Sequence, residues 1–239
     1  MIKKESINKI LVVSIFAIAM AFLETTVVIY LRKLLYPEGF NFPLKAFIDP
    51  SIINIEWVRE FATIVMLIAI GILAGKKLYS KIAYFLLAFA VWDIFYYVFL
   101  KITLNWPDSF FTWDLLFLIP WPWIGPVLAP LLCTILILIA SFMIIKLEDN
   151  GFEIKLKKNE LFFIILGVIV VLYTWLYDYG KIILFRGYAK SFFNWSTNLS
   201  FIETINNYLP SNFNWILFLI GLVISSLAII KAYLRIKKR

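Results

Sequence analysis

Six stretches of the chain are apolar over the length that a helix needs to cross a membrane, which is about 20 residues. They are residues 8–31, 57–75, 80–100, 123–146, 161–179 and 213–234. A soluble domain of 239 residues could not bury the apolar surface of a sequence that is 63% hydrophobic and 16% charged. The sequence therefore predicts an all-α fold, a multi-pass membrane bundle of about six helices in one domain.

The residue types that are missing exclude several kinds of site. The chain has no histidine and one cysteine, Cys133, which lies within an apolar run. Haem ligation, zinc hydrolysis and a histidine proton relay depend on those residue types, and one thiol cannot form an internal disulfide. We expect no cofactor, and a metal ion would have to be a hard cation held by carboxylates and carbonyls.

Basic residues at the ends of the apolar segments predict the orientation. Of the 23 Lys and Arg residues, 15 fall on the side of both termini and 8 on the other. Under the positive-inside rule this places both termini in the cytoplasm. The net charge of +8 then reflects topology, and we expect no nucleic acid as a partner. The first segment starts like a signal peptide, but its apolar pattern continues to Leu31, which favours an uncleaved anchor.

Several charged residues lie inside the apolar segments, toward their outer ends. Glu24 lies seven residues before Leu31, or about 10 Å inside the outer end of the first helix, and Asp93 lies at a similar depth in the third. Arg59 and Glu60 fall in the first turn of the second helix. An ionised side chain at the centre of a bilayer costs about 2.5–3.5 kcal/mol. We therefore expect these groups to face the bundle interior, a partner or water.

The sequence leaves three interpretations of these acids open. In the first, the acids form buried pairs that only hold helices in register, such as Glu60 or Glu24 with Arg59 or Arg32. Alternatively they line a ligand, ion or proton site, or they reach interfacial water from the helix ends. Glu56 and Glu60 lie four residues apart on one helical face, where they repel each other unless a cation or a proton lies between them. This spacing favours a site.

Aromatic residues are concentrated on the same side of the membrane. By the predicted topology all nine tryptophans lie in the outer half or the outer loops, whereas ordinary aromatic belts occur at both interfaces. This one-sided excess suggests that some rings line a pocket. The candidate ligand-binding residues are Glu24, Arg59, Glu60, Trp92, Asp93, Tyr97, Asp114 and Trp121.

Prolines break the long apolar run before the fourth membrane segment. The pattern predicts a short interfacial or re-entrant helix over 112–119, followed by a spanning helix over 123–146. Pro122, Pro126 and Pro130 would share one face of that second helix. The carbonyls that they displace from helical hydrogen bonds would then need water, a side chain or a ligand.

The last outer loop, about residues 180–212, contains an amphipathic pattern. Ser200 and Glu203 have the spacing of a capping box, and Phe201 belongs to a series of apolar residues on one helical face. We expect an amphipathic helix on the outer surface here. At the second membrane segment, Asn54 is placed to cap the helix.

Two segments resemble known sequences. Residues 24–43, ETTVVIYLRKLLYPEGFNFP, and residues 92–130 are similar to multi-pass inner-membrane proteins of bacteria that are described only as uncharacterised. The resemblance covers part of the chain. It implies a location in the bacterial inner membrane and brings no activity with it.

Three functions remain open from the sequence. The first is a binding or transport module with an outward-facing acidic and aromatic pocket for an amphipathic or cationic small molecule or a lipid. Without an internal repeat, six helices make a small transporter, so we expect a homo-oligomer or a membrane partner protein besides membrane lipids. The second is a membrane enzyme that modifies a lipid or isoprenoid, with Glu24, Asp93 and Asp114 as acid and base. The third is an accessory or scaffold subunit.

Overall fold

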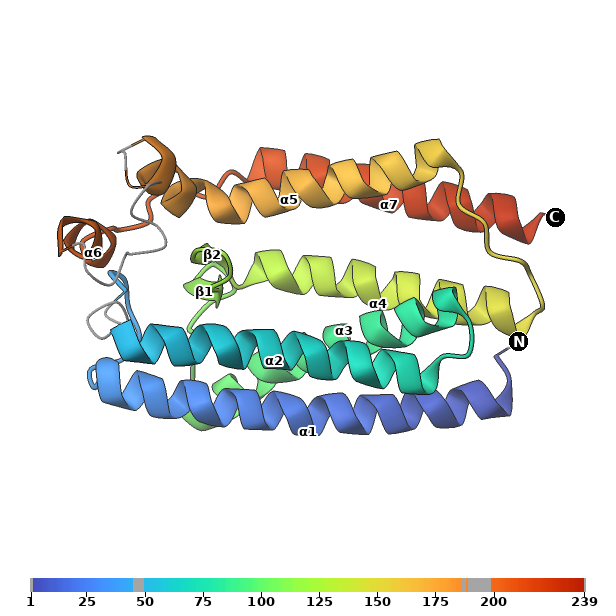
Figure 1. Ribbon diagram of the computed structural model, residues 1–239, viewed down its shortest axis with the longest axis horizontal. Coiled ribbons are helices and arrows are strands. Elements are labelled where there is room, and N and C mark those ends of the chain that lie inside the picture. Colours follow the sequence, from blue (N-terminus) through green and yellow to red (C-terminus); the bar gives the residue numbers. More distant parts are fainter. Residues whose placement is uncertain (1, 45–49, 186–187, 189–198, 239) are drawn as a thin grey trace.

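The computed structural model of the protein describes residues 2–44, 50–185, 188 and 199–238. Six long helices, one short helix and a two-stranded sheet account for most of this part (Figure 1). In chain order they are α1 (Lys4–Leu35), α2 (Pro50–Ala74), α3 (Leu78–Leu104), β1 (Trp113–Phe117), β2 (Trp123–Pro126), α4 (Leu128–Asp149), α5 (Lys158–Phe185), α6 (Leu199–Asn206) and α7 (Trp215–Lys237). The six long helices are each long and apolar enough to cross a membrane, which confirms the predicted helical membrane fold.

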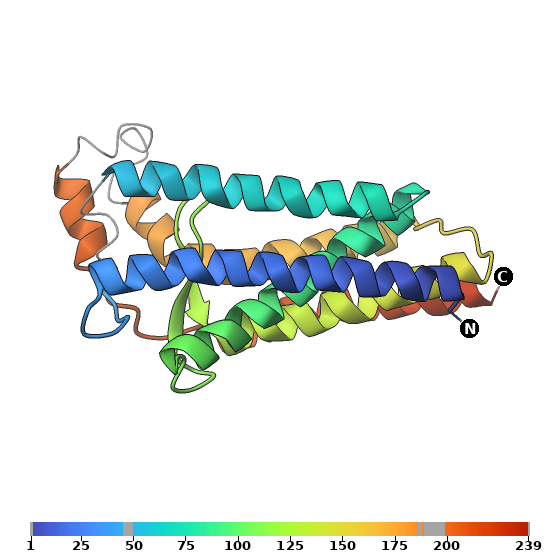
Figure 2. The ribbon, with the colours of Figure 1, turned by 90° about the horizontal axis from the view of Figure 1, so that it is seen from below.

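The long helices form two groups. In the first, α3 packs against α1, α2 and α4, and in the second α5 packs along α7. α4 also contacts α7 and so joins the groups. Both chain termini lie at one end of the bundle, which we call the terminal end, and α6 lies at the opposite end, the α6 end (Figures 1 and 2).

Small residues allow α5 and α7 to approach closely. A Cβ atom at Gly167 would lie 2.1 Å from the Oγ of Ser225, and one at Gly221 would lie 2.8 Å from the carbonyl oxygen of Gly167. Small residues at such an interface let helix backbones pack together within a membrane. Near the terminal end, the guanidinium of Arg235 donates to both carboxylate oxygens of Glu160 at 2.7 Å each, which ties the same two helices.

The segment before α4 is a β-hairpin, so the short helix predicted over 112–119 is wrong. β1 pairs with β2 in antiparallel register, and α4 begins at Leu128 and not at residue 123. A residue that precedes proline is disfavoured in helical conformation, and Ile119, Trp121 and Gly125 each precede one. The backbones of the two strands pair with each other, as non-helical backbone in a membrane bundle requires.

The predicted row of prolines on one helical face is also wrong. Pro122 precedes β2, Pro126 ends it, and only Pro130 of the three lies in α4. Pro130 falls in the first turn, where no helical hydrogen bond would use its missing N–H. These prolines therefore shape a turn and a helix start and do not displace a series of helical carbonyls.

The ends of two helices differ from the predicted caps. α2 begins at Pro50, so Asn54 lies inside the helix. α6 confirms an amphipathic helix, but Ser200 lies within it, with its hydroxyl 2.8 Å from that of Tyr188. The apolar face of α6 is buried against the bundle, because Phe201 belongs to one cluster with residues of α2 and α5. α6 therefore packs across the ends of α2 and α5.

Candidate functional site

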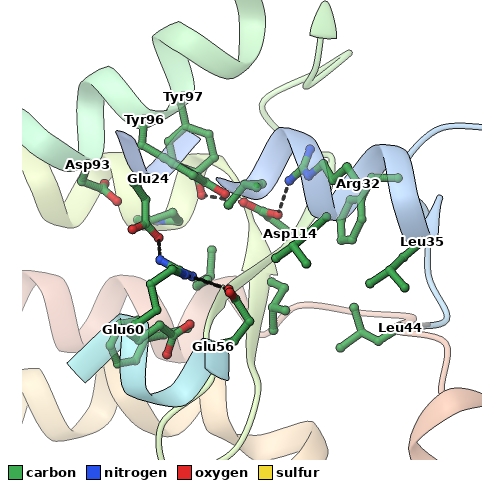
Figure 3. Close-up of a pocket in the computed structure, with 18 of the residues that line it drawn as sticks. Glu24, Arg32, Leu35, Leu44, Glu56, Glu60, Asp93, Tyr96, Tyr97 and Asp114 are labelled. Carbon is green, nitrogen blue, oxygen red and sulfur yellow. Dashed lines mark hydrogen bonds and ion pairs between the residues drawn. The ribbon is translucent and has the colours of Figure 1, made fainter. Parts of the chain in front are cut away.

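Most of the candidate residues line one cavity in the α6 half of the bundle, which we call the acidic cavity (Figure 3). Its walls come from α1, α2, α3, β1 and the first turn of α4, and its volume is about 120 Å³. One water needs roughly 10–15 Å³ on this measure, so several fit. The polar lining consists of Glu24, Arg32, Glu56, Arg59, Glu60, Asp93, Tyr96, Tyr97 and Asp114. Five carboxylates thus face two guanidinium groups.

Arg59 of α2 binds two of these carboxylates. Its Nη1 donates to Oε1 of Glu24 on α1, and its Nε and Nη2 donate to Oε2 of Glu56 at 2.9 and 2.6 Å. The hydroxyl of Thr63 lies 3.4 Å from the second carboxylate oxygen of Glu24. Because α1 and α2 both pack mainly against α3, this charged cluster bridges two helices that otherwise contact each other little.

Arg32 of α1 anchors β1 to the helices. Its Nη2 donates to Oδ1 of Asp114 at 3.1 Å, and the hydroxyl of Tyr97 on α3 donates to Oδ2 at 3.1 Å. The guanidinium carbon also lies 3.7 Å from the ring centroid of Trp106 and 4.3 Å from that of Phe40. Arg32 is 7% exposed and Asp114 1% exposed. An ion pair and two cation–π contacts together stabilise this buried charge.

Glu60 holds the turn of the hairpin. Its two carboxylate oxygens accept the backbone N–H of Leu118 at 2.8 and 3.1 Å. Glu60 lies ten residues after Pro50, the first residue of α2, and therefore about 15 Å along that helix at 1.5 Å per residue. The hairpin thus reaches well into the bundle. Within the described ranges Glu60 forms no ion pair.

Asp93 of α3 also lacks a cationic partner in the part of the chain that the structure describes. Its Oδ2 accepts the hydroxyl of Thr134 on α4 at 2.6 Å. A carboxylate away from bulk water is expensive without a compensating charge or proton. The described residues contain no group of three acids or thiols that could hold a metal ion. Glu60 and Asp93 are therefore the two acids of the cavity that a bound organic cation or a proton would satisfy.

Seven of the eight predicted candidates line the acidic cavity, and Trp121 does not. The Nε1 of Trp121 instead donates to the carbonyl of Leu176 at 3.1 Å, which ties the hairpin to α5. Of the buried pairs suggested by the sequence, Glu24 with Arg59 is present. Arg32, Glu56 and Tyr96 also line the cavity but were not among the candidates. The sequence gives no signal for Arg32 as a site residue, because it has the position of an ordinary helix-end charge. Its partner, Asp114, lies 82 residues away in sequence.

Comparisons of the chain with protein-family models, with curated proteins and with solved structures give no match. The chemistry of the cavity is therefore the basis on which a function can be inferred.

Proposed function

We propose that the protein is a membrane binding or transport module whose acidic cavity takes up the cationic group of a small amphipathic molecule. The observation that carries the proposal is the position of Glu60 and Asp93, two carboxylates that line one cavity and form no ion pair among the described residues. The other three carboxylates already bind Arg32 or Arg59. An ammonium group in the cavity would supply these two carboxylates with the ion-pair partner that the described residues do not.

The aromatic lining supports a cation in particular. Trp92, Tyr96 and Tyr97 lie on α3 beside Asp93 and line the same cavity. The faces of such rings attract an ammonium group by about 0.5–2 kcal/mol each, and most strongly where water is excluded. Carboxylates supply the charge and the rings supply a surface for the methyl or methylene groups around it.

The proposal places the site on the outer side of the bacterial inner membrane. The excess of Lys and Arg at the terminal end assigns that end to the cytoplasm, and the acidic cavity belongs to the opposite half. The bacterial inner membrane is also the location that the sequence of residues 24–43 and 92–130 led us to expect. The module would then receive its ligand from outside the cell or from the outer leaflet.

Binding of tritiated tetramethylammonium to the protein in lipid nanodiscs, measured by scintillation proximity, tests the proposal. We expect saturable binding that Asp93→Asn and Glu60→Gln each weaken at least tenfold, because each change removes a negative charge at nearly constant volume. Asp108→Asn, an exposed acid in the loop after α3, is the matched control and should leave binding unchanged. Wild-type binding no tighter than that of the Asp93→Asn/Glu60→Gln double variant would reject the site and favour a scaffold.

A further inference from the structure

A second and larger cavity adjoins the acidic one. It has a volume of about 400 Å³ and is bounded by α2, α3, α4, α5, α7 and the hairpin, so it lies where the two helix groups meet. Among the described residues that line it, Asp93 is the one charged residue, and the others are aliphatic or aromatic apart from Thr134, Ser225 and Cys133. We call it the apolar cavity. A cavity of about 150 Å³ already admits benzene, so this one has room for a longer hydrocarbon.

The two cavities share a wall. Both are lined by Trp92, Asp93, Leu116, Phe117 and Pro130. Asp93 faces the acidic cavity, while its hydrogen bond to a threonine of α4 places the same carboxylate at the apolar cavity. A molecule whose cationic group lies beside Asp93 therefore has an apolar space next to it.

The junction of the cavities also presents a hydrogen-bond donor. Trp92 is 8% exposed, and its Nε1 is buried without a hydrogen-bond partner in the described part of the chain. A buried donor that finds no acceptor costs about 1–3 kcal/mol. An oxygen of a ligand near the point where its head joins its chain would satisfy this indole.

The apolar cavity lies between helices that do not all pack closely against one another. Ile64 of α2 and Val168 of α5 both line it, and these two helices do not form a closely packed pair among the described residues. Val168 is 47% exposed. We therefore expect a hydrocarbon chain to enter this cavity between α2 and α5.

We infer that the apolar cavity holds the hydrocarbon chain of the same molecule whose cationic group occupies the acidic cavity, so that the ligand class is an alkylammonium amphiphile. This inference rests on the proposed function, since it assigns the remainder of that molecule. The acidic cavity provides charge recognition, and the apolar cavity selects for a chain.

Two tritiated probes in nanodiscs, tetramethylammonium and dodecyltrimethylammonium, test the inference, with the concentration of the long probe expressed per lipid. Ile137→Trp places a large ring in the apolar cavity, and Ile139→Trp makes the same change two residues away on the lipid-facing side of α4, where Ile139 is 47% exposed. We expect Ile137→Trp to weaken binding of the long probe at least tenfold and that of tetramethylammonium less than twofold. Ile139→Trp should alter neither.

The outcomes separate this inference from the proposed function. If tetramethylammonium does not bind the wild-type protein, the proposed function fails. If it binds, but both tryptophan variants bind the long probe equally well, the chain lies elsewhere and only the inference is wrong. If uncharged dodecanol displaces the long probe as effectively as unlabelled dodecyltrimethylammonium does, the apolar cavity is a general lipid site without coupling to the acidic cavity. Retained tetramethylammonium binding also shows that the Ile137→Trp variant is folded.

Discussion

Replacement of Asp114 by asparagine removes the carboxylate on which the position of β1 depends. Asparagine preserves the shape and can still accept the hydrogen bond of Tyr97, but it leaves the buried guanidinium of Arg32 without a counter-charge. Breaking a buried pair from one side costs about 3–5 kcal/mol. We expect the lower end, about 3 kcal/mol, because the rings of Phe40 and Trp106 keep their cation–π contacts with the guanidinium.

Removing both charges should cost less than the two single changes together. Arg32→Met replaces the guanidinium by an apolar side chain. When Asp114→Asn is added to it, no buried charge is left without a partner. Each single variant leaves one buried charge without its partner, whereas the double variant leaves none. The loss of stability in the double variant should therefore be smaller than the sum of the single losses by about 2 kcal/mol or more.

Unfolding by sodium dodecyl sulfate in mixed micelles, followed by far-ultraviolet circular dichroism, would measure the free energy of unfolding of the four proteins. The exposed variant Asp108→Asn is the control and should lie within about 0.5 kcal/mol of wild type. Losses that add, with a coupling free energy below about 0.5 kcal/mol, would refute the reasoning. Arg32 and Asp114 would then stabilise the protein independently of each other.

Three further predictions concern Glu60, the contact of α5 with α7, and the orientation in the membrane. Glu60→Leu should destabilise the protein by about 1–3 kcal/mol, because the backbone N–H of Leu118 loses its acceptor. Glu60→Gln should retain most of the stability. Equal losses of the two variants in the detergent assay would contradict the role of Glu60 as that acceptor. Gly167→Ala should cost about 1–3 kcal/mol by overpacking against Ser225, and an unchanged Tm would show that α5 and α7 are farther apart. An alkaline phosphatase reporter fused after Lys158 should be inactive, and activity would reverse the proposed orientation.

The membrane helices and the level of the acids could be predicted because both follow from local rules. A span needs a minimum apolar length, and a fixed rise per residue converts sequence position into depth. Glu24 and Asp93 were thereby placed at similar levels on two helices, and they line one cavity. Glu60 was predicted in the first turn of its helix, but α2 begins at Pro50, so Glu60 lies about 15 Å along it. The helix ends were less predictable: α1 spans Lys4–Leu35 and exceeds the predicted 8–31 at both ends, because polar flanking residues continue the helix.

The hairpin could not be predicted because its stability depends on distant residues. Its strands are short and apolar apart from Asp114, and the run from Leu115 onward has the composition of a membrane helix. What distinguishes it is a set of tertiary contacts, namely the carboxylate of Glu60 at the N–H of Leu118 and the ion pair between Asp114 and Arg32. A local pattern carries no information about partners 58 and 82 residues away.

The distribution of tryptophan has a practical consequence for spectroscopy. The eight described tryptophans lie between the middle of α3 and the α6 end, and the ninth, Trp195, lies outside the described residues. Intrinsic tryptophan fluorescence from the described part of the protein therefore originates between the middle of the bundle and the α6 end, where the acidic cavity lies. Loosening of the terminal end would leave this emission almost unchanged, so fluorescence and circular dichroism together can report the two halves of the bundle separately.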